Sequence, residues 1–425
     1  MNHHQFDTIA LHGGQVPDPV TKSRAVPIYM TSSYVFEDTD HAASLFQMQE
    51  PGFIYSRNAN PTNAVFEERM AQLEGGVASF AVSSGQAAIS IALLTLARAG
   101  DEIVSTQALY GGTYHLFAET FSKFGINVHF VDGTDFTSLE GKINKRTKAI
   151  FTETIGNPNM EVAHLEKLSE IAKRHGLPLV VDNTFTTPFL LKPLAFGADI
   201  VVHSATKFIG GHGTAIGGVI VDGGRFEWSN ERFPSFNEKK PAIGNRSYVE
   251  ISREKAFILK ARFELGHDLG ATLSAFNSWL FIQGLESLSV RVEKQVANAQ
   301  VLAKRLGELP HISWVNYPGL ESHPQYHLGK KYFPSGAGAI FTFGIKGGIS
   351  TAKRFINSLK LVSHLANVGD AKTLIIHPAS TTHARLSPGQ QAEAGVSPEM
   401  IRLSVGLEDP VDVMADITQA LKQCT

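Results

Sequence analysis

The sequence lacks most features that mark disulfide-rich, metal-clustered or nucleic-acid-binding proteins. Its 425 residues include a single cysteine, Cys424, so the chain can form neither an internal disulfide nor a cysteine-rich metal site. Its 38 lysines and arginines nearly balance 40 aspartates and glutamates, and the net charge of −2 comes without a long run of one sign. This balance argues against nucleic acid or an anionic membrane as the main partner.

Long apolar runs and targeting segments are also missing. The most apolar helical stretch, residues 87–97, is interrupted by Ser90 and Thr95, and it is far shorter than the roughly 20 residues that span a membrane. The first residues, MNHHQFDTIALHGG, contain no basic region followed by an apolar one, which a secretory signal requires. We therefore expect a soluble, cytoplasmic protein without a membrane partner.

Glycine, in contrast, is plentiful and unevenly placed. Half of the 38 glycines lie between residues 75 and 224, which indicates places where the backbone approaches another group closely. The same part of the chain alternates β-rich runs with helical patterns, which predicts an α/β fold with a large, mostly parallel, seven-stranded sheet. Ligands of such sheets bind beyond the carboxyl ends of the strands. The predicted strands are residues 78–82, 102–105, 127–131, 149–153, 179–182, 199–203 and 218–221.

The patterning divides the chain into three parts. Residues 1–64 show little periodicity and several prolines, so we expect an N-terminal arm that lies on its own subunit or on a neighbouring one. Residues 65–265 hold the sheet domain, in which the polar and aromatic segment 225–244 is interpreted as an insertion or a lid. Residues 266–425 predict a smaller α+β domain, reached through a long connecting helix over 287–306.

The most informative stretch is ADIVVHSATKFIGGHGTAIGG, residues 198–218. Its strand would deliver Ser204, Thr206 and Lys207 to the carboxyl edge of the sheet. Two hydroxyls beside a lysine can bind phosphate, and a desolvated lysine is a nucleophilic amine that can form a Schiff base. An isolated Thr-Lys pair after a strand is more often an ordinary surface feature. The flanking apolar strand and the glycines that follow favour the chemical interpretation.

Three further segments carry candidate site residues. Asp182 follows the buried residues Val180 and Val181, where an acid is costly unless it has a cationic partner. Alone it is equally an N-cap or turn residue, but together with Lys207 it is a candidate partner for a protonated ring nitrogen. A Schiff-base lysine with an acid on a pyridinium is the arrangement that binds pyridoxal 5'-phosphate (PLP).

The other two segments are VSSGQAAISIALL (82–94) and the glycine pair that follows Tyr110. A helix that begins near Gln86 would present free backbone N–H groups to a phosphate, although a serine-capped turn is the commoner interpretation of such a segment. Tyr110 could stack on a flat cofactor or serve only in packing.

These four segments, in this order, resemble the PLP-dependent enzymes of cysteine and methionine metabolism, the cystathionine γ-synthase-like group. The resemblance runs from LHGGQVPDP at residue 11 to IRLSVGLED at 401–409. It implies an aminotransferase-like fold (fold type I). Within the family, PIYMTSSYVFED, ETIGNPNMEV, FIGGHGTAIGG and the 225–244 insertion are most similar to the O-acetylhomoserine sulfhydrylases, or homocysteine synthases.

The resemblance implies roles for individual residues. Lys207 would carry PLP, Asp182 would hold the pyridine nitrogen protonated, Tyr110 would stack on the ring and transfer protons, and Asn157 would contact the 3-oxygen. Ser84, Gly85, Gln86, Thr184, Ser204 and Thr206 would also contact the cofactor, together with Tyr55 and Arg57 from a neighbouring subunit.

On the substrate side, the resemblance implies that Arg402 clamps the α-carboxylate bidentately, which a lysine does poorly. Tyr55 and Asn367 would also contact the substrate. Asn367 stands where γ-synthases and lyases of the family usually have serine, and this favours the sulfhydrylase branch. No metal ligand is expected.

The implied reaction is a γ-replacement. Sulfide or methanethiol replaces acetate on O-acetyl-L-homoserine and gives L-homocysteine or L-methionine, in a homotetramer built from dimers with shared active sites. Methionine γ-lyase and cystathionine γ-synthase are alternatives on the same scaffold. A phosphate- or nucleotide-binding module is disfavoured because Thr206-Lys207 precedes its glycines. A metal hydrolase is disfavoured because His203 and His212 lack a carboxylate–histidine set with ligand spacing.

Overall fold

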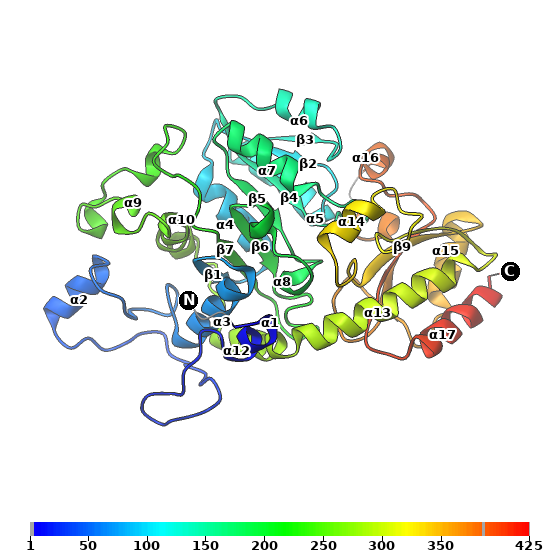
Figure 1. Cartoon of the computed structure of the whole chain (residues 1–425), viewed down its shortest axis with the longest axis horizontal. Coiled ribbons are helices and arrows are strands. Elements are labelled where there is room, and N and C mark those ends of the chain that lie inside the picture. Colours follow the sequence, from blue (N-terminus) through cyan, green and yellow to red (C-terminus); the bar gives the residue numbers. More distant parts are fainter. Residues whose placement is uncertain (1–3, 385–386, 425) are drawn as a thin grey trace.

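The computed structural model describes residues 4–384 and 387–424. A large body holds a seven-stranded sheet, and a smaller body at the C-terminal end is joined to it by one long helix (Figure 1). The strand order is β1-β7-β6-β5-β4-β2-β3, with β7 antiparallel to its neighbours and the remaining pairs parallel. The strands are β1 (Ala78–Val82), β2 (Glu102–Thr106), β3 (Asn127–Val131), β4 (Thr147–Glu153), β5 (Leu179–Asp182), β6 (Ile200–Ser204) and β7 (Gly218–Asp222). The predicted seven-stranded α/β sheet is confirmed, with strand ends within two residues of those expected.

The central strands carry apolar residues at both odd and even positions because both faces of the sheet are covered. Val180 and Val181 of β5 are both fully buried, and they belong to the two different core clusters, since successive side chains of a strand point to opposite faces. One core is completed by α4 (Gly85–Leu96) and α10 (Ala256–Ala261). The other is completed by α3 (Pro61–Glu74) and α7 (Leu165–Arg174).

Helix α3 shows how local sequence sets these boundaries. Asn60 accepts a hydrogen bond from the backbone N–H of Thr62, Pro61 occupies the first turn, and Gly75 ends the helix at φ +81°. Helix α12 (Ala275–Glu286) packs against it. The remaining short elements of this part are α5 (Gly111–His115), α6 (Phe136–Gly141), α8 (Thr187–Leu190), α9 (Tyr248–Ile251), α11 (His267–Leu269), a 3₁₀ turn at Pro193–Phe196 and π-helical turns at Leu116–Phe121 and Arg262–Gly266.

The smaller body contains a five-stranded sheet in the order β10-β11-β12-β9-β8, antiparallel except for the β10–β11 pair. Its strands are β8 (Ile312–Asn316), β9 (Ile340–Ile345), β10 (Ser363–His364), β11 (Leu374–Ile376) and β12 (Met400–Ser404). Its helices are the connecting α13 (Leu288–Gly307), α14 (Tyr326–Tyr332), α15 (Gly348–Asn357), α16 (Pro388–Glu393), α17 (Pro410–Lys422) and a 3₁₀ turn at Pro378–Ser380. The expected connecting helix and the smaller α+β unit are both present, while the boundaries at residues 64 and 265 stay predictions. Within the described residues, no helix is long and apolar enough to cross a membrane.

The N-terminal arm is mostly irregular, and it also forms two short helices, α1 (Phe6–His12) and α2 (Thr39–Phe46). Helix α1 packs against α3 and α12, whereas α2 lies at the edge of the molecule (Figure 1). Between them the chain leaves large apolar side chains exposed, including Met30 and Val35.

The 225–244 segment is an integral part of the core. Trp228, Phe233 and Phe236 are fully buried, and the Trp228 ring stacks on Phe236 at 4.4 Å and on Phe257 of α10 at 5.5 Å. Two 3₁₀ turns, Pro234–Phe236 and Pro241–Ile243, fold the segment back on itself. No residue of the segment lines the pocket described below. The aromatic side chains of the segment are buried in the core and do not cover the pocket of their own chain, which does not support the lid interpretation, while the insertion stays a prediction.

Candidate active site

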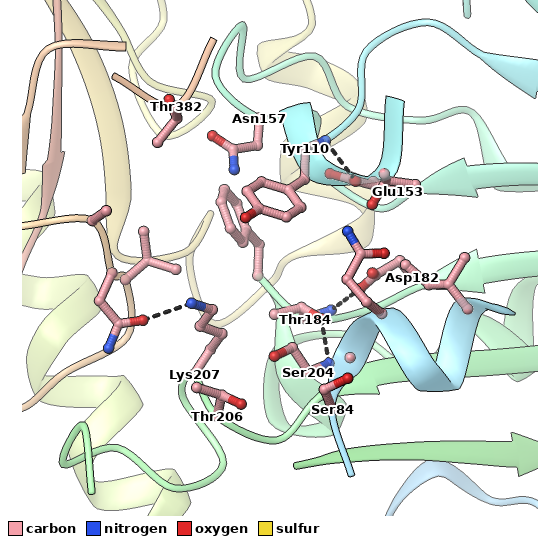
Figure 2. Close-up of a pocket in the computed structure, with 18 of the residues that line it drawn as sticks. Ser84, Tyr110, Glu153, Asn157, Asp182, Thr184, Ser204, Thr206, Lys207 and Thr382 are labelled. Carbon is pink, nitrogen blue, oxygen red and sulfur yellow. Dashed lines mark hydrogen bonds between the residues drawn. The ribbon is translucent and has the colours of Figure 1, made fainter. Parts of the chain in front are cut away.

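A pocket of about 280 Å³ lies at the carboxyl ends of β4, β5 and β6, where the N-terminus of α4 and strand β12 of the smaller body also meet it (Figure 2). It collects all the predicted site residues except the two on the N-terminal arm. The polar and titratable residues that line it are Ser84, Gln86, Tyr110, Thr113, Glu153, Asn157, Asp182, Thr184, Ser204, Thr206, Lys207, Asn367, Thr382 and Arg402.

Lys207 follows the end of β6 and projects its amine into the pocket. Nζ donates a hydrogen bond to Oδ1 of Asn367 at 2.6 Å, as Figure 2 shows by a dashed line at the amine. Burial, together with the positive charge of Arg402, lowers the pKa of Lys207 to about 8. Such an amine is partly unprotonated near neutral pH, which a nucleophile or a base requires.

Asp182 ends β5 and has no cation beside it. Its Oδ1 accepts a hydrogen bond from the backbone N–H of Thr184 at 2.9 Å. Thr184 Oγ1 in turn accepts a hydrogen bond from the backbone N–H of Ser204 at 2.9 Å, and this bond links the ends of β5 and β6. In the described residues no Lys, Arg or His nitrogen lies within 4.0 Å of this carboxyl. Burial raises the pKa of Asp182, against the lowering effect of the Thr184 hydrogen bonds. The cationic partner that the sequence requires therefore has to come from a ligand.

The start of α4 forms a cradle for an anion. Ser84 is the N-cap, and its side chain accepts the N–H of Ala87 at 3.1 Å. The N–H groups at Gly85 and Gln86 lie in the first turn, where a helix has no partner of its own. A Cβ atom on Gly85 would lie 2.6 Å from Cβ of Ser204, so only glycine lets the helix start approach the end of β6. The predicted helix start is confirmed, and the serine cap is present as well.

Arg402 is a buried cation without a counter-charge. It lies on β12, and its Nη1 donates to Oδ1 of Asn157 at 3.0 Å while Nη2 donates to the carbonyl oxygen of Asn367 at 3.3 Å. No carboxylate among the described residues pairs with it. Burial lowers the pKa of Arg402 to about 10. A buried guanidinium held only by neutral groups is a site for an anionic ligand, such as the carboxylate of an amino acid.

Tyr110 and Glu153 form a pair that the sequence analysis did not identify as such. The ring of Tyr110 stands in the pocket (Figure 2), and its backbone N–H donates to Oε1 of Glu153 at 2.7 Å. Burial raises the pKa of Glu153 well above its usual range, and the neighbouring Asp182 adds to this effect. The available signal was an acid at the end of a buried strand, the same feature that identified Asp182. Thr382 also lines the pocket from the smaller body, and no sequence pattern identified it.

Tyr55 and Arg57 do not reach the pocket of their own chain. Both are exposed, and the Arg57 guanidinium lies 5.6 Å from the centre of the Tyr55 ring and donates to the carbonyl oxygen of His267 at 3.1 Å. His203, weighed above as a metal ligand, is fully buried and lies 2.6 Å from Oε1 of Glu74. His212 is exposed.

A family model described as Cys/Met metabolism PLP-dependent enzyme matches residues 7–422. The chain belongs to this family. It is 52% identical to an O-acetyl-L-homoserine sulfhydrylase of Leptospira meyeri, with 98% of this chain and 96% of that protein covered. It is 51% identical to a homocysteine synthase of Schizosaccharomyces pombe, with 98% of both covered.

Among solved structures, the chain is similar to a protein of Campylobacter jejuni assigned as an O-acetylhomoserine (thiol)-lyase, which carries N'-pyridoxyl-lysine-5'-monophosphate. The TM-score is 0.96 at 41% identity, with 99% of this chain and 100% of that chain covered. The predicted aminotransferase-like architecture (fold type I) and the predicted PLP dependence are confirmed.

The pocket of this PLP-dependent enzyme fits its cofactor chemically. PLP presents an aldehyde, a ring nitrogen and a phosphate. The pocket offers a desolvated amine at Lys207, a carboxyl without a cation at Asp182, and a glycine-lined helix start beside the Ser204 hydroxyl. Among the residues that the structure describes, each of these groups lacks a charged partner, and each matches one part of PLP.

Proposed function

We propose that this enzyme is an O-acetylhomoserine sulfhydrylase, which replaces the acetate of O-acetyl-L-homoserine by sulfide or methanethiol and forms L-homocysteine or L-methionine. The observation that carries the proposal is the hydrogen-bonded series Lys207–Asn367–Arg402. It sets a desolvated amine and an unpaired guanidinium on one wall, where an amino acid can present its α-carbon and its α-carboxylate. The names of relatives that are 48–52% identical over nearly the whole chain support the choice of reaction.

For the cofactor we propose that Lys207 binds PLP covalently and that Asp182 faces the ring nitrogen. Tyr110 would stack on the ring and Asn157 would contact the 3-oxygen. The phosphate end would be held by Gly85 and Gln86 through the backbone and by the hydroxyls of Ser84, Thr184, Ser204 and Thr206. When bound, PLP accepts the electrons left at the α-carbon after proton loss.

The chain's own residues then bind the substrate and move its protons. Arg402 binds the α-carboxylate and fixes the orientation of the amino acid, with Asn367 beside it. Lys207 Nζ takes the proton from the α-carbon, and with Tyr110 it returns protons after the exchange. The acetate leaves from the γ-carbon and the sulfur nucleophile bonds to the same atom.

We further propose that the protein is a cytoplasmic homotetramer built from dimers, in which Tyr55 and Arg57 complete the site of a neighbouring subunit. The exposure of both side chains and of the apolar arm residues Met30 and Val35 supports this assembly.

The test is a product assay with a lysine variant. The wild-type enzyme forms homocysteine from O-acetyl-L-homoserine and sulfide, while Lys207→Ala forms none and also loses the chromophore that borohydride reduces. Turnover by Lys207→Ala close to that of the wild type would contradict the assigned role.

A further inference from the structure

Two carboxyl groups stand side by side at the end of the sheet. Glu153 is the last residue of β4 and Asp182 the last residue of β5, and the two are partners in the parallel register of these strands. Neighbouring strands lie about 4.8 Å apart. Both side chains line the pocket and are drawn in Figure 2. The proposed reaction uses only Asp182, so the second acid at this edge has no assigned role.

Each carboxyl accepts one hydrogen bond from a backbone N–H. Glu153 Oε1 accepts from Tyr110 at 2.7 Å, and Asp182 Oδ1 accepts from Thr184 at 2.9 Å. In the part of the chain that the structure describes, neither has a Lys, Arg or His nitrogen within 4.0 Å. Two adjacent carboxylates without a cation repel each other in a buried site, so one of the two retains its proton. The other ionisable groups around the pair are Tyr110, Lys207 and Arg402 in the pocket and the Glu74–His203 pair at β6.

The surroundings decide which carboxyl keeps the proton. Asp182 is stabilised as an anion by hydrogen bonds from Thr184 and by the field of His203. For Glu153, only the hydrogen bond from the Tyr110 N–H favours the anion, whereas burial and the negative charge of Asp182 both favour the protonated form. The pKa of Glu153 is therefore raised well above the usual range, and this group is the acid that remains neutral.

We propose that Glu153 is a positioning residue: it stays protonated on Oε2, leaves Asp182 as the one anion of the pair, and fixes Tyr110 through the bond that Oε1 accepts. The inference rests on the proposed role of Asp182 at the ring nitrogen. Tyr110 is the N-cap of the short helix α5 and makes no side-chain cap hydrogen bond there, and the Glu153 bond anchors its backbone N–H at the pocket. A neutral Glu153 makes this bond without adding a second negative charge beside Asp182.

The protonation state is measured by infrared spectroscopy on the chain without PLP, which separates this inference from the reaction. Glu161 is partly buried and Asp222 fully buried, and desolvation raises the pKa of each to about 7. The spectra are therefore compared at about pH 8, where those two groups are mostly ionised. The wild type minus Glu153→Gln difference shows the carbonyl stretch of a protonated carboxyl. A carboxylate band in that difference would overturn the proposal, whether or not the enzyme is a sulfhydrylase.

The positioning role is measured by the affinity for PLP. Glu153→Gln keeps the oxygen that accepts from Tyr110 and the neutral state, so it binds PLP within about twofold of the wild type. Glu153→Leu loses the acceptor and binds PLP about tenfold more weakly, the effect of one hydrogen bond. An equal loss in both variants would mean that a negative charge is needed at Glu153, and the proposal would be wrong. Thermal unfolding of each variant monitors folding, with Glu161→Gln as the control at a partly buried acid outside the pocket. If Glu153→Leu does not fold, the proposal is tested by the infrared band and by the PLP affinity of Glu153→Gln.

Discussion

Lys207 Nζ donates a hydrogen bond of 2.6 Å to Oδ1 of Asn367, and this contact joins the edge of the large sheet to the smaller body. The same Asn367 accepts from Arg402 through its carbonyl oxygen at 3.3 Å. One residue therefore orients both the amine and the guanidinium of the pocket. In the account proposed above, these two groups act on the α-carbon and the α-carboxylate of the substrate.

Replacing Asn367 by aspartate puts a negative charge beside the Lys207 amine. An opposite charge favours the protonated amine, so the pKa of Lys207 rises from about 8. We expect the rate of PLP incorporation into the chain to have its midpoint at higher pH in Asn367→Asp than in the wild type. Absorbance of the bound cofactor during mixing across a pH series measures this. A midpoint that stays the same or moves to lower pH would mean that the Lys207 amine does not lie beside residue 367 in solution.

The pKa of Lys207 also sets the pH dependence of cofactor attachment in the wild type. Attachment needs the unprotonated amine, which is the minor form below the pKa of about 8. We therefore expect the rate of PLP incorporation to fall about tenfold for each pH unit below that value and to level off above it. Arg402→Gln removes a positive charge that lowers this pKa, so its profile moves to higher pH. Identical profiles for the two proteins would contradict the coupling between Arg402 and Lys207.

Arg402 is expected to bind the substrate carboxylate through two parallel hydrogen bonds. A lysine offers a point charge without this fork, so Arg402→Lys raises KM for O-acetyl-L-homoserine and lowers kcat/KM by about a hundredfold, or about 3 kcal/mol. Steady-state kinetics with saturating sulfide measure the change. PLP affinity within about threefold of the wild type is the control, because Arg402 is placed on the substrate side. A normal KM in Arg402→Lys would remove this residue from substrate binding.

The buried aromatic cluster of the 225–244 segment should stabilise the fold without touching the substrate. Trp228→Ala leaves a cavity between Phe236 and Phe257 and lowers the free energy of unfolding by about 3–5 kcal/mol. KM stays at the wild-type value, since Trp228 lies outside the pocket. Denaturant titration and kinetics on the same preparation test both parts. A large change in KM with little loss of stability would restore the lid interpretation.

Sharing of sites between subunits predicts complementation. Lys207→Ala and Arg57→Ala chains each form inactive homo-oligomers, but a mixed dimer has one site with both residues intact. Equal mixing with reassembly therefore restores about a quarter of the wild-type activity. If Arg57 served its own chain, the mixture would remain inactive.

The sequence predicted the sheet because strands such as β5 have apolar residues at both odd and even positions, a composition that is typical of strands buried on both faces. The same reasoning brought Lys207 and Asp182 together, since both follow parallel strands that end at one edge of the sheet. Arg402 and Asn367 lie about 160–200 residues further along, and only a family resemblance placed them near Lys207.

Glu153 was missed although it ends a predicted strand, because its importance depends on the register that sets it beside Asp182. The aromatic residues of 225–244 have no periodic spacing, so the sequence left both an insertion and a lid open. Irregular backbone can still bury its side chains when the neighbouring helix α10 supplies an apolar face.

The central claim is the choice of substrate, and a matched panel tests it most directly. The purified enzyme is supplied with O-acetyl- or O-succinyl-L-homoserine, each with sulfide, methanethiol or cysteine, and separately with methionine alone, and the products are quantified. The account predicts that homocysteine from O-acetyl-L-homoserine and sulfide, or methionine with methanethiol, forms with the highest kcat/KM. Cystathionine from cysteine as the main product, or 2-oxobutyrate from methionine without added thiol, would contradict it.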